Sequence, residues 1–196
     1  MESADIPRFP YNKRIIFFDT ETSGLNPEVH EILQLSYFVV DGATWEVLKK
    51  KDFYFPYPED ECRVSRRAIE INHLTKEFLS RRTISTRYDG LSQFYADLYT
   101  CQMAVAHNIR FDYDFIEHTA SVEKVPRHAW PFMYCTMMET INVCQIEDSR
   151  RWGYKYPRLE ELAKFLHINY NKDSLHDSFT DKLRSEERRV GKECRS

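Results

Sequence analysis

The chain has 196 residues, of which 42% are hydrophobic and 30% charged, and its formal net charge is −3. This length suits one domain with a hydrophobic core, and the composition excludes an intrinsically disordered protein. The sequence contains no apolar run of the roughly 20 residues that a membrane span needs, and its start lacks the regions of a signal peptide. We therefore expect a cytoplasmic protein with no membrane partner and without a strongly basic surface over the whole molecule.

The hydrophobic pattern predicts an α/β domain with a mixed sheet. The apolar run 15–18 predicts a buried first strand that ends at Asp19. Segments 32–40 and 46–55, separated by the turn-prone Asp41-Gly42, predict a hairpin. Two shorter strands are predicted at 103–106 and 132–136. Helices are predicted at 66–71, 76–80, 88–99, 111–119, 137–144, 159–166 and around Asp177, and Asn108 suits an N-cap.

Asp19 and Glu21 form the first group of residues with chemical potential. They are two residues apart at the end of a strand, so their side chains point to one side of it. Two carboxylates this close are costly to ionise unless a cation neutralises them, and hard cations prefer oxygen ligands. The pair predicts a metal site, with a simple turn in which Asp19 and Thr20 bond the backbone as the alternative.

The second group follows the strand at 103–106 and opens a helix. Phe111 and Phe115, four residues apart, predict the buried side of this helix, which holds a neighbouring acid at the sheet edge. Either Asp112 or Asp114 could be that acid. The alternative is an ordinary acid in a first helical turn, which the helix dipole favours.

The third group is His176 with Asp181, five residues later. A histidine in this position could act as a titrating base beside a metal-ligand carboxylate. A separate basic segment, 63–87, has seven basic and two acidic residues and could hold phosphates, with a solvated surface as the alternative.

Together, these groups resemble the motifs of the DEDD exonuclease superfamily, in its histidine branch, which includes the proofreading subunit of bacterial DNA polymerase III. Residues 18–25 (FDTETSGL) resemble the first motif, 105–115 the second, and 176–181 (HDSFTD) the third. The resemblance implies a ribonuclease-H-like α/β fold, with a mixed five-stranded sheet flanked by helices. It selects Asp112 over Asp114, and Asp177 stands where the tyrosine branch has its Tyr.

The resemblance also implies the role of each site residue. Four carboxylates would hold two divalent ions, Mg²⁺ or Mn²⁺, and His176 would be the general base. The metal ligands would be Asp19, Glu21, Asp112 and Asp181. The terminal nucleotide would contact Thr20, Thr22, Leu25, His107, Asn108 and Phe111. The family commonly reads V-H-G-I-T where this chain has Ile71-Asn72-His73-Leu74-Thr75, so either Asn72 or His73 would take the place of the family's histidine.

These observations predict a metal-dependent 3′→5′ exonuclease that releases 5′-mononucleotides from nucleic acid, with single-stranded DNA as the favoured partner and a DNA polymerase as a further one. The alternatives are an RNA-trimming exonuclease or oligoribonuclease, and a catalytically silent polymerase-binding module. We expect an N-terminal extension at 1–13, an exonuclease domain at 14–184 and a tail at 185–196. This tail has too little apolar area to order itself and is either solvated or an assembly scar.

Overall fold

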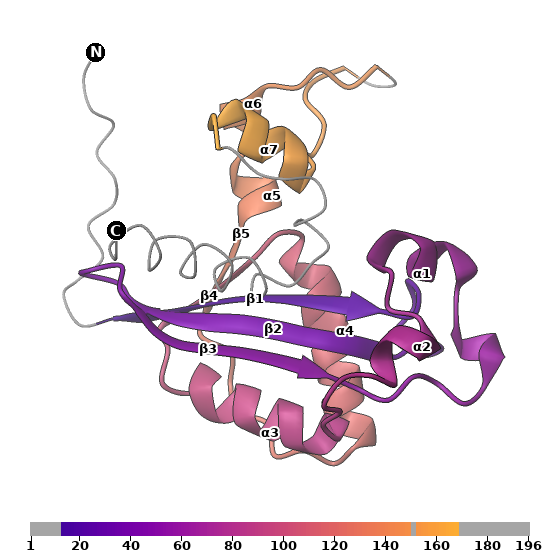
Figure 1. The fold of residues 1–196 in the computed structure, drawn as a ribbon. Coiled ribbons are helices and arrows are strands. Elements are labelled where there is room, and N and C mark those ends of the chain that lie inside the picture. Colours follow the sequence, from indigo (N-terminus) through magenta and orange to yellow (C-terminus); the bar gives the residue numbers. More distant parts are fainter. Residues whose placement is uncertain (1–12, 150–151, 169–196) are drawn as a thin grey trace, which may run out of the picture.

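A computed structural model describes residues 13–149 and 152–168 of the protein. Its centre is a five-stranded sheet in the order β3-β2-β1-β4-β5 (Figure 1). β2 is antiparallel to both β1 and β3, whereas β4 and β5 run parallel to β1. The strands are β1 (Arg14–Thr22), β2 (Ile32–Asp41), β3 (Val47–Tyr54), β4 (Met103–Ala106) and β5 (Phe132–Cys135). The predicted mixed five-stranded sheet is therefore confirmed.

Helices connect β3 to β4 and β4 to β5, and three more follow β5 within the described residues. They are the 3₁₀ helix η1 (Glu61–Arg63) and the α-helices α1 (Arg66–Asn72), α2 (Lys76–Leu79), α3 (Arg87–Leu98), α4 (Ile109–Val122), α5 (Thr136–Glu139), α6 (Ile141–Cys144) and α7 (Leu159–Phe165). In Figure 1, α1 and α2 lie beyond the end to which β1 points, and α5, α6 and α7 form a separate group above the sheet.

The main core lies between the sheet and the helices α3 and α4. Residues of β1 and β2 meet residues of both helices in one buried cluster, with Phe94 of α3 at its centre. The Phe94 ring centroid lies 5.5 Å from that of Phe18, 5.4 Å from that of Tyr37 and 5.8 Å from that of Trp130. The opposite face of the sheet carries a smaller cluster around Ile15. Burial on both faces explains why β1 reads as a continuous apolar run.

β1 is longer than its apolar run predicts. The strand continues beyond Asp19 to Thr22, because Thr20 and Thr22 are buried and pair with residues of β2. The pairing shifts register between Glu21, opposite Gln34, and Thr22, opposite Ile32. The acidic residues therefore lie on the strand itself, just before a bulge.

Two further details differ from the prediction. The segment 137–144 forms two short helices instead of one, because Thr140 (φ −101°, ψ 7°) leaves the helical conformation between them. Asn108 does occupy the N-cap position of α4, but in a left-handed conformation (φ 65°, ψ 44°) and without a side-chain capping bond.

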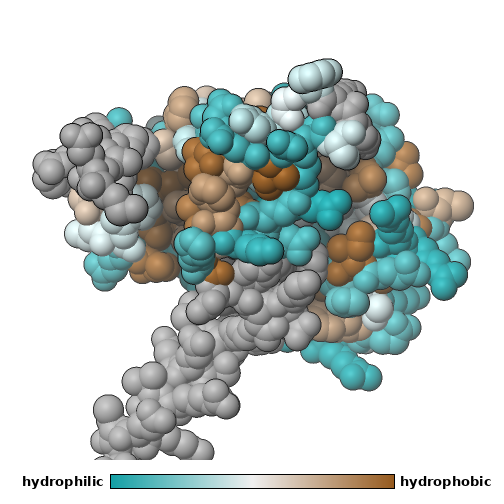
Figure 2. Space-filling view, turned by 90° about the horizontal axis from the view of Figure 1, so that it is seen from above, coloured by the Kyte–Doolittle hydropathy of each residue, from teal (hydrophilic) through white to brown (hydrophobic). Residues whose placement is uncertain are grey.

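Several predictions concern residues outside those that the structure describes. These are the N-terminal extension up to residue 12, His176, the helix around Asp177, Asp181, and the tail at 185–196. In the described part of the chain, no helix has both the length and the apolar character of a membrane span. The surface seen from above mixes hydrophilic and hydrophobic residues, as Figure 2 shows.

Candidate active site

Three carboxylates gather at the carboxyl end of β1. Asp19 and Glu21 lie on the strand, and Asp112 lies in the first turn of α4, which follows the neighbouring parallel strand β4. Asp112 is 2% exposed, and its Oδ1 accepts hydrogen bonds from the Thr20 backbone N–H at 2.8 Å and the Thr20 hydroxyl at 2.7 Å. Parallel strands place their connecting loops at one edge of a sheet, so residues about 90 apart in sequence meet here.

The surroundings of these carboxylates oppose their ionisation. Burial raises the pKa of Glu21 to about 8, and the negative charges of Asp19 and Asp112 add to this effect. Part of the Asp19 side chain reaches the surface, but desolvation of the remainder still raises its pKa to about 6. The pKa of Asp112 is also raised, first by burial and then by the charge of Asp19, while its bonds from Thr20 act in the opposite direction.

The donor chemistry of this cluster suits a hard cation. It consists of carboxylate oxygens, and a cation would remove the repulsion among them. Within 13–149 and 152–168, however, no three His, Cys, Asp or Glu side chains are close enough together to hold an ion by themselves. One oxygen of Asp112 is already bonded to Thr20. A complete metal centre therefore needs further ligands or a small rearrangement of these side chains.

Asp112 and Asp114 differ clearly in their environment. Asp114 lies at the surface and forms an ion pair with Arg110 at 3.0 Å, one turn earlier on α4. Asp112, in contrast, is buried beside Thr20. The structure thus brings Asp112 to the carboxylates of β1 and leaves Asp114 outside the cluster.

Asn72 and His73, which the sequence left as alternatives, face different surroundings at the end of α1. Asn72 is buried, and its Nδ2 donates to the carbonyl oxygen of Thr22 at 3.0 Å. His73 is exposed and adopts a left-handed conformation (φ 59°, ψ 13°) as the C-cap of the helix. Of the two side chains, Asn72 lies next to the end of β1.

The loop after β1 presents Leu25 to solvent. Leu25 is 82% exposed, whereas the Thr22 hydroxyl is buried and donates to the carbonyl oxygen of Gly24 at 2.6 Å. A Cβ at position 24 would lie 2.0 Å from Cδ2 of His30, so the close approach of this ring requires glycine. The loop geometry therefore leaves the Leu25 side chain free to contact a ligand.

His107 has protein partners at both ring nitrogens. Its Nε2 lies 3.1 Å from the carbonyl oxygen of Pro157, and its Nδ1 lies 3.0 Å from Oγ1 of Thr136. A carbonyl only accepts, so Nε2 carries the proton of the neutral ring, and the Thr136 hydroxyl shares its single proton between Nδ1 and the carbonyl oxygen of Ala106 at 3.3 Å. Burial lowers the pKa of His107. This ring links β4 to the segments around α5 and α7.

The other two residues predicted in the second motif are oriented differently. Asn108 is exposed, and no capping bond holds its side chain. Phe111 is partly buried, and its ring centroid lies 4.9 Å from that of Phe115, as their spacing of four predicts. Asn108 is thus the more accessible of the two.

A comparison with known protein families identifies the family of the chain that carries these carboxylates. The family model described as "Exonuclease" matches residues 16–185. This range includes all three motifs, at 18–25, 105–115 and 176–181. The chain belongs to the exonuclease family.

The relatives of this exonuclease include a ribonuclease and a subunit of a DNA polymerase. The chain is 27% identical to ribonuclease T of Buchnera aphidicola over 176 residues, which are 85% of this chain and 77% of that protein. It is 28% identical to DNA polymerase III subunit epsilon of Rickettsia prowazekii over 170 residues, covering 86% and 69% of the two chains. Such relatives are 3′→5′ exonucleases, so the predicted type of enzyme is confirmed.

Solved structures show the same fold. Exonuclease I of E. coli in complex with a dA16 oligonucleotide superposes with a TM-score of 0.68 at 19% identity, over 86% of this chain and 38% of that one. The ribonuclease-H-like class expected for the exonuclease is thereby confirmed. Members of this family are metal-dependent. This chain spans about two fifths of the exonuclease I chain.

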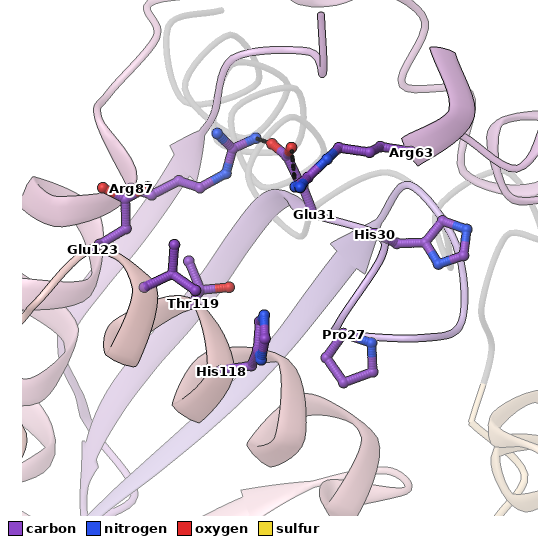
Figure 3. A pocket seen from close by; sticks show the side chains of 9 residues that line it. Pro27, His30, Glu31, Arg63, Arg87, His118, Thr119 and Glu123 are labelled. Carbon is purple, nitrogen blue, oxygen red and sulfur yellow. Dashed lines mark hydrogen bonds and ion pairs between the residues drawn. The ribbon is translucent and has the colours of Figure 1, made fainter. Parts of the chain in front are cut away.

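The exonuclease also has a pocket of about 120 Å³ that lies apart from the carboxylates. Figure 3 shows it between the loop before β2 and the later turns of α4, with Arg63 and Arg87 directed toward Glu31. Glu31 accepts from Arg87 at 2.7 Å and from Arg63 at 3.1 Å. These polar groups largely satisfy one another, so we assign the pocket no ligand.

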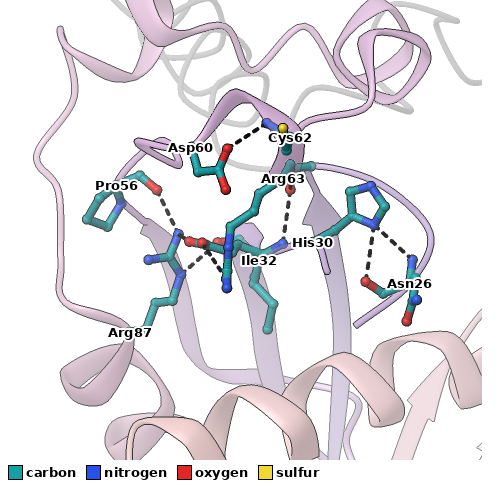
Figure 4. A network of polar contacts seen from close by, with 10 residues as sticks. Asn26, His30, Ile32, Pro56, Asp60, Cys62, Arg63 and Arg87 are labelled. Atoms are coloured by element: carbon teal, nitrogen blue, oxygen red, sulfur yellow. Dashed lines mark hydrogen bonds and ion pairs between the residues drawn. The ribbon is translucent and has the colours of Figure 1, made fainter. Parts of the chain in front are cut away.

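This network was not foreseen from the sequence. Arg87 also donates to the carbonyl oxygens of Ile32 (3.3 Å) and Pro56 (2.7 Å), which ties the start of α3 to β2 and to the segment after β3 (Figure 4). Two members of the basic segment 63–87 are thus turned to Glu31, and a third, Arg66, pairs with Glu70 at 3.0 Å. For these three arginines, a structural or solvated role fits better than a phosphate site.

Proposed function

We propose that this exonuclease removes 5′-mononucleotides from the 3′ end of single-stranded DNA by two-metal-ion hydrolysis, with Mg²⁺ or Mn²⁺. The observation that carries this proposal is the convergence of Asp19, Glu21 and Asp112 at the end of β1, where desolvation raises all three pKa values and repulsion from neighbouring carboxylates adds to the effect for Glu21 and Asp112. Such a group is costly in a folded protein unless a cation compensates it.

Asp19, Glu21 and Asp112 would hold the metal ions, together with Asp181, which lies outside the described residues. Bound divalent ions supply a nucleophile at neutral pH and neutralise the charge that develops on the phosphate. The bonds from Thr20 fix the orientation of Asp112 and leave its second oxygen for a ligand. His176, also outside the described residues, would accept the proton of the attacking water, a role that typically contributes about 10²- to 10⁴-fold.

The exposed residues around the carboxylates would bind the terminal nucleotide. Leu25 offers an apolar side chain for contact with a base, and Asn108 and His73 offer polar side chains to sugar or phosphate. Thr20 and Thr22 are buried, so they would act mainly through their backbone and through the shape of the loop. Phe111 is partly buried, so it would contact the nucleotide with the exposed part of its ring.

RNA trimming is the second candidate function. The similarity to ribonuclease T extends over 85% of this chain, which is as much as the similarity to the polymerase subunit. The motifs are the same in exonucleases that act on DNA and on RNA, so they do not show whether the substrate carries deoxyribose or ribose. The similarity to subunit epsilon supports a DNA polymerase as a protein partner and an action in the cytoplasm.

The decisive experiment compares substrates and labels. Single-stranded DNA, duplex DNA and RNA, each labelled at the 3′ or the 5′ end, are digested with Mg²⁺, Mn²⁺ or EDTA. We expect early release of the 3′ label as a mononucleotide, fastest from single-stranded DNA, and no digestion in EDTA. Early release of the 5′ label, or digestion in EDTA, would reject the proposal, and faster digestion of RNA would establish the second function.

A further inference from the structure

Asn72 ties the end of α1 to the strand that carries the acidic residues. It is the last residue of α1 and is 4% exposed. Its amide donates to the carbonyl oxygen of Thr22, the last residue of β1, at 3.0 Å. Thr22 directly follows Glu21, so this bond reaches the backbone next to a predicted metal ligand.

The orientation of this amide is determined by its neighbours. The Oδ1 of Asn72 accepts from the backbone N–H of Leu74 at 3.1 Å, across the left-handed turn at His73. The Nδ2 therefore points toward β1, where it donates to Thr22 and lies near enough to the carboxylate of Glu21 to lower the pKa of that group. Each polar atom of the side chain thus has a partner.

The end of β1 needs such support because its pairing with β2 is irregular. The register shifts between Glu21 and Thr22, so the regular ladder does not continue through this point. A buried carbonyl needs a hydrogen-bond donor, and α1 supplies one to Thr22 at this point. The position of Glu21 therefore depends on a side chain about 50 residues away in sequence.

We propose that Asn72 is a positioning residue that holds Glu21, through its backbone and its carboxylate, in the place from which it binds metal. This role differs from the contact with substrate, for which the sequence left Asn72 and His73 as alternatives. It rests on the proposed function, in which Glu21 is a metal ligand. Residues that orient a metal ligand typically change metal affinity or activity by about 10- to 100-fold when they are removed.

Three variants separate positioning from simple stability. Asn72→Ala removes the entire amide. Asn72→Ser keeps a short acceptor for the N–H of Leu74 but lacks the reach to donate to Thr22. Leu74→Ala is the matched control, because Leu74 lies in the same turn and is buried in a separate cluster around Leu33, so its truncation lowers stability without removing a donor.

Two measurements are made on the full chain. Mn²⁺ affinity is determined from the electron paramagnetic resonance of free Mn²⁺, and kcat and KM are determined on a single-stranded oligonucleotide at several Mn²⁺ concentrations. We expect both Asn72 variants to bind Mn²⁺ about 10-fold more weakly. Their kcat should fall at low Mn²⁺ and recover at high Mn²⁺, with KM for the oligonucleotide unchanged. Leu74→Ala should melt at a lower temperature and bind Mn²⁺ like the wild type.

The outcomes distinguish this inference from the proposed function. A wild-type protein that binds no Mn²⁺ would reject both. Wild-type Mn²⁺ affinity in Asn72→Ser, or a raised KM with unchanged metal affinity, would reject the positioning role alone. Equal loss of affinity in Leu74→Ala, or loss of the folded state in both Asn72 variants, would show a purely structural role and reject it as well.

Discussion

Asp112 and Asp114 lie two residues apart on α4 and provide a matched pair of carboxylates. Asp112→Asn should lower kcat by at least about 100-fold. Loss of a residue that orients a metal ligand lowers activity by up to about 100-fold, and loss of the ligand itself should lower activity at least as much. Asp114→Asn should stay within about twofold of the wild type, since it removes only a surface ion pair with Arg110. Initial rates of 3′ label release check both values. Similar losses in the two variants would contradict the assignment of Asp112.

Glu21 should make the stability of the metal-free protein depend on pH. Its pKa is about 8 in the folded state, against 4.5 for an unperturbed glutamate. The folded state therefore binds an extra proton between these values, and it loses stability as pH rises through this range. Glu21→Gln should therefore raise the melting temperature in EDTA at pH 8 and have little effect at pH 5, where Glu21 is already protonated.

Thermal melts of the wild type and Glu21→Gln from pH 5 to pH 8 check this prediction. Glu70→Gln is the control, because Glu70 is exposed on α1 and forms an ion pair with Arg66. A Glu21→Gln variant that is less stable than the wild type at pH 8 in EDTA would show that the ionised carboxylate is favourably placed without metal.

At the scale of elements, His107 joins β4 to the group formed by α5, α6 and α7. His107→Ala removes both of its bonds, at about 0.5–1.5 kcal/mol each, and should loosen this group without disturbing β1 and β2. Hydrogen exchange should become faster in 136–165 and stay unchanged in the central strands. His128→Ala, at an exposed position, is the control, and unchanged exchange in His107→Ala would refute the linking role.

The sequence predicted those elements whose signals are local. The apolar run before Asp19 identifies the central strand, and Phe111 with Phe115 identifies the buried side of α4. Both follow from the periodicity of a single segment. The sequence could not predict the break at Thr140, because the residues on both sides of it are compatible with a continuous helix.

Contacts between distant segments could not be derived from the sequence. The pairing of Glu31 with Arg63 and Arg87 joins the loop before β2 to η1 and to the start of α3, and it has no local pattern. The choice between Asn72 and His73 depended on a left-handed turn, which glycine would have signalled but histidine does not. The roles of His176 and Asp181 remain predictions, because both lie outside the described residues.

At the scale of the whole molecule, metal binding should stabilise the fold. A ligand at about 100 times its Kd adds about 2.7 kcal/mol to the free energy of unfolding. For a protein of this size, this corresponds to a rise in melting temperature of about 5–11 °C. Thermal melts with and without Mn²⁺ check the value. Asp19→Asn should reduce the shift, and an equal shift in that variant would place the ion elsewhere.

The two outer strands of the sheet affect how this exonuclease meets other molecules. β3 is the outermost strand on one side, and it carries the consecutive lysines Lys49, Lys50 and Lys51. A second chain that added a strand at this edge would place its side chains next to these positive charges. Lysines on an edge strand are a known obstacle to aggregation through open sheet edges. β5, the outermost strand on the other side, has four residues and is too short to pair with a long added strand. We therefore expect contacts with other proteins to use helices and loops rather than an extension of the sheet.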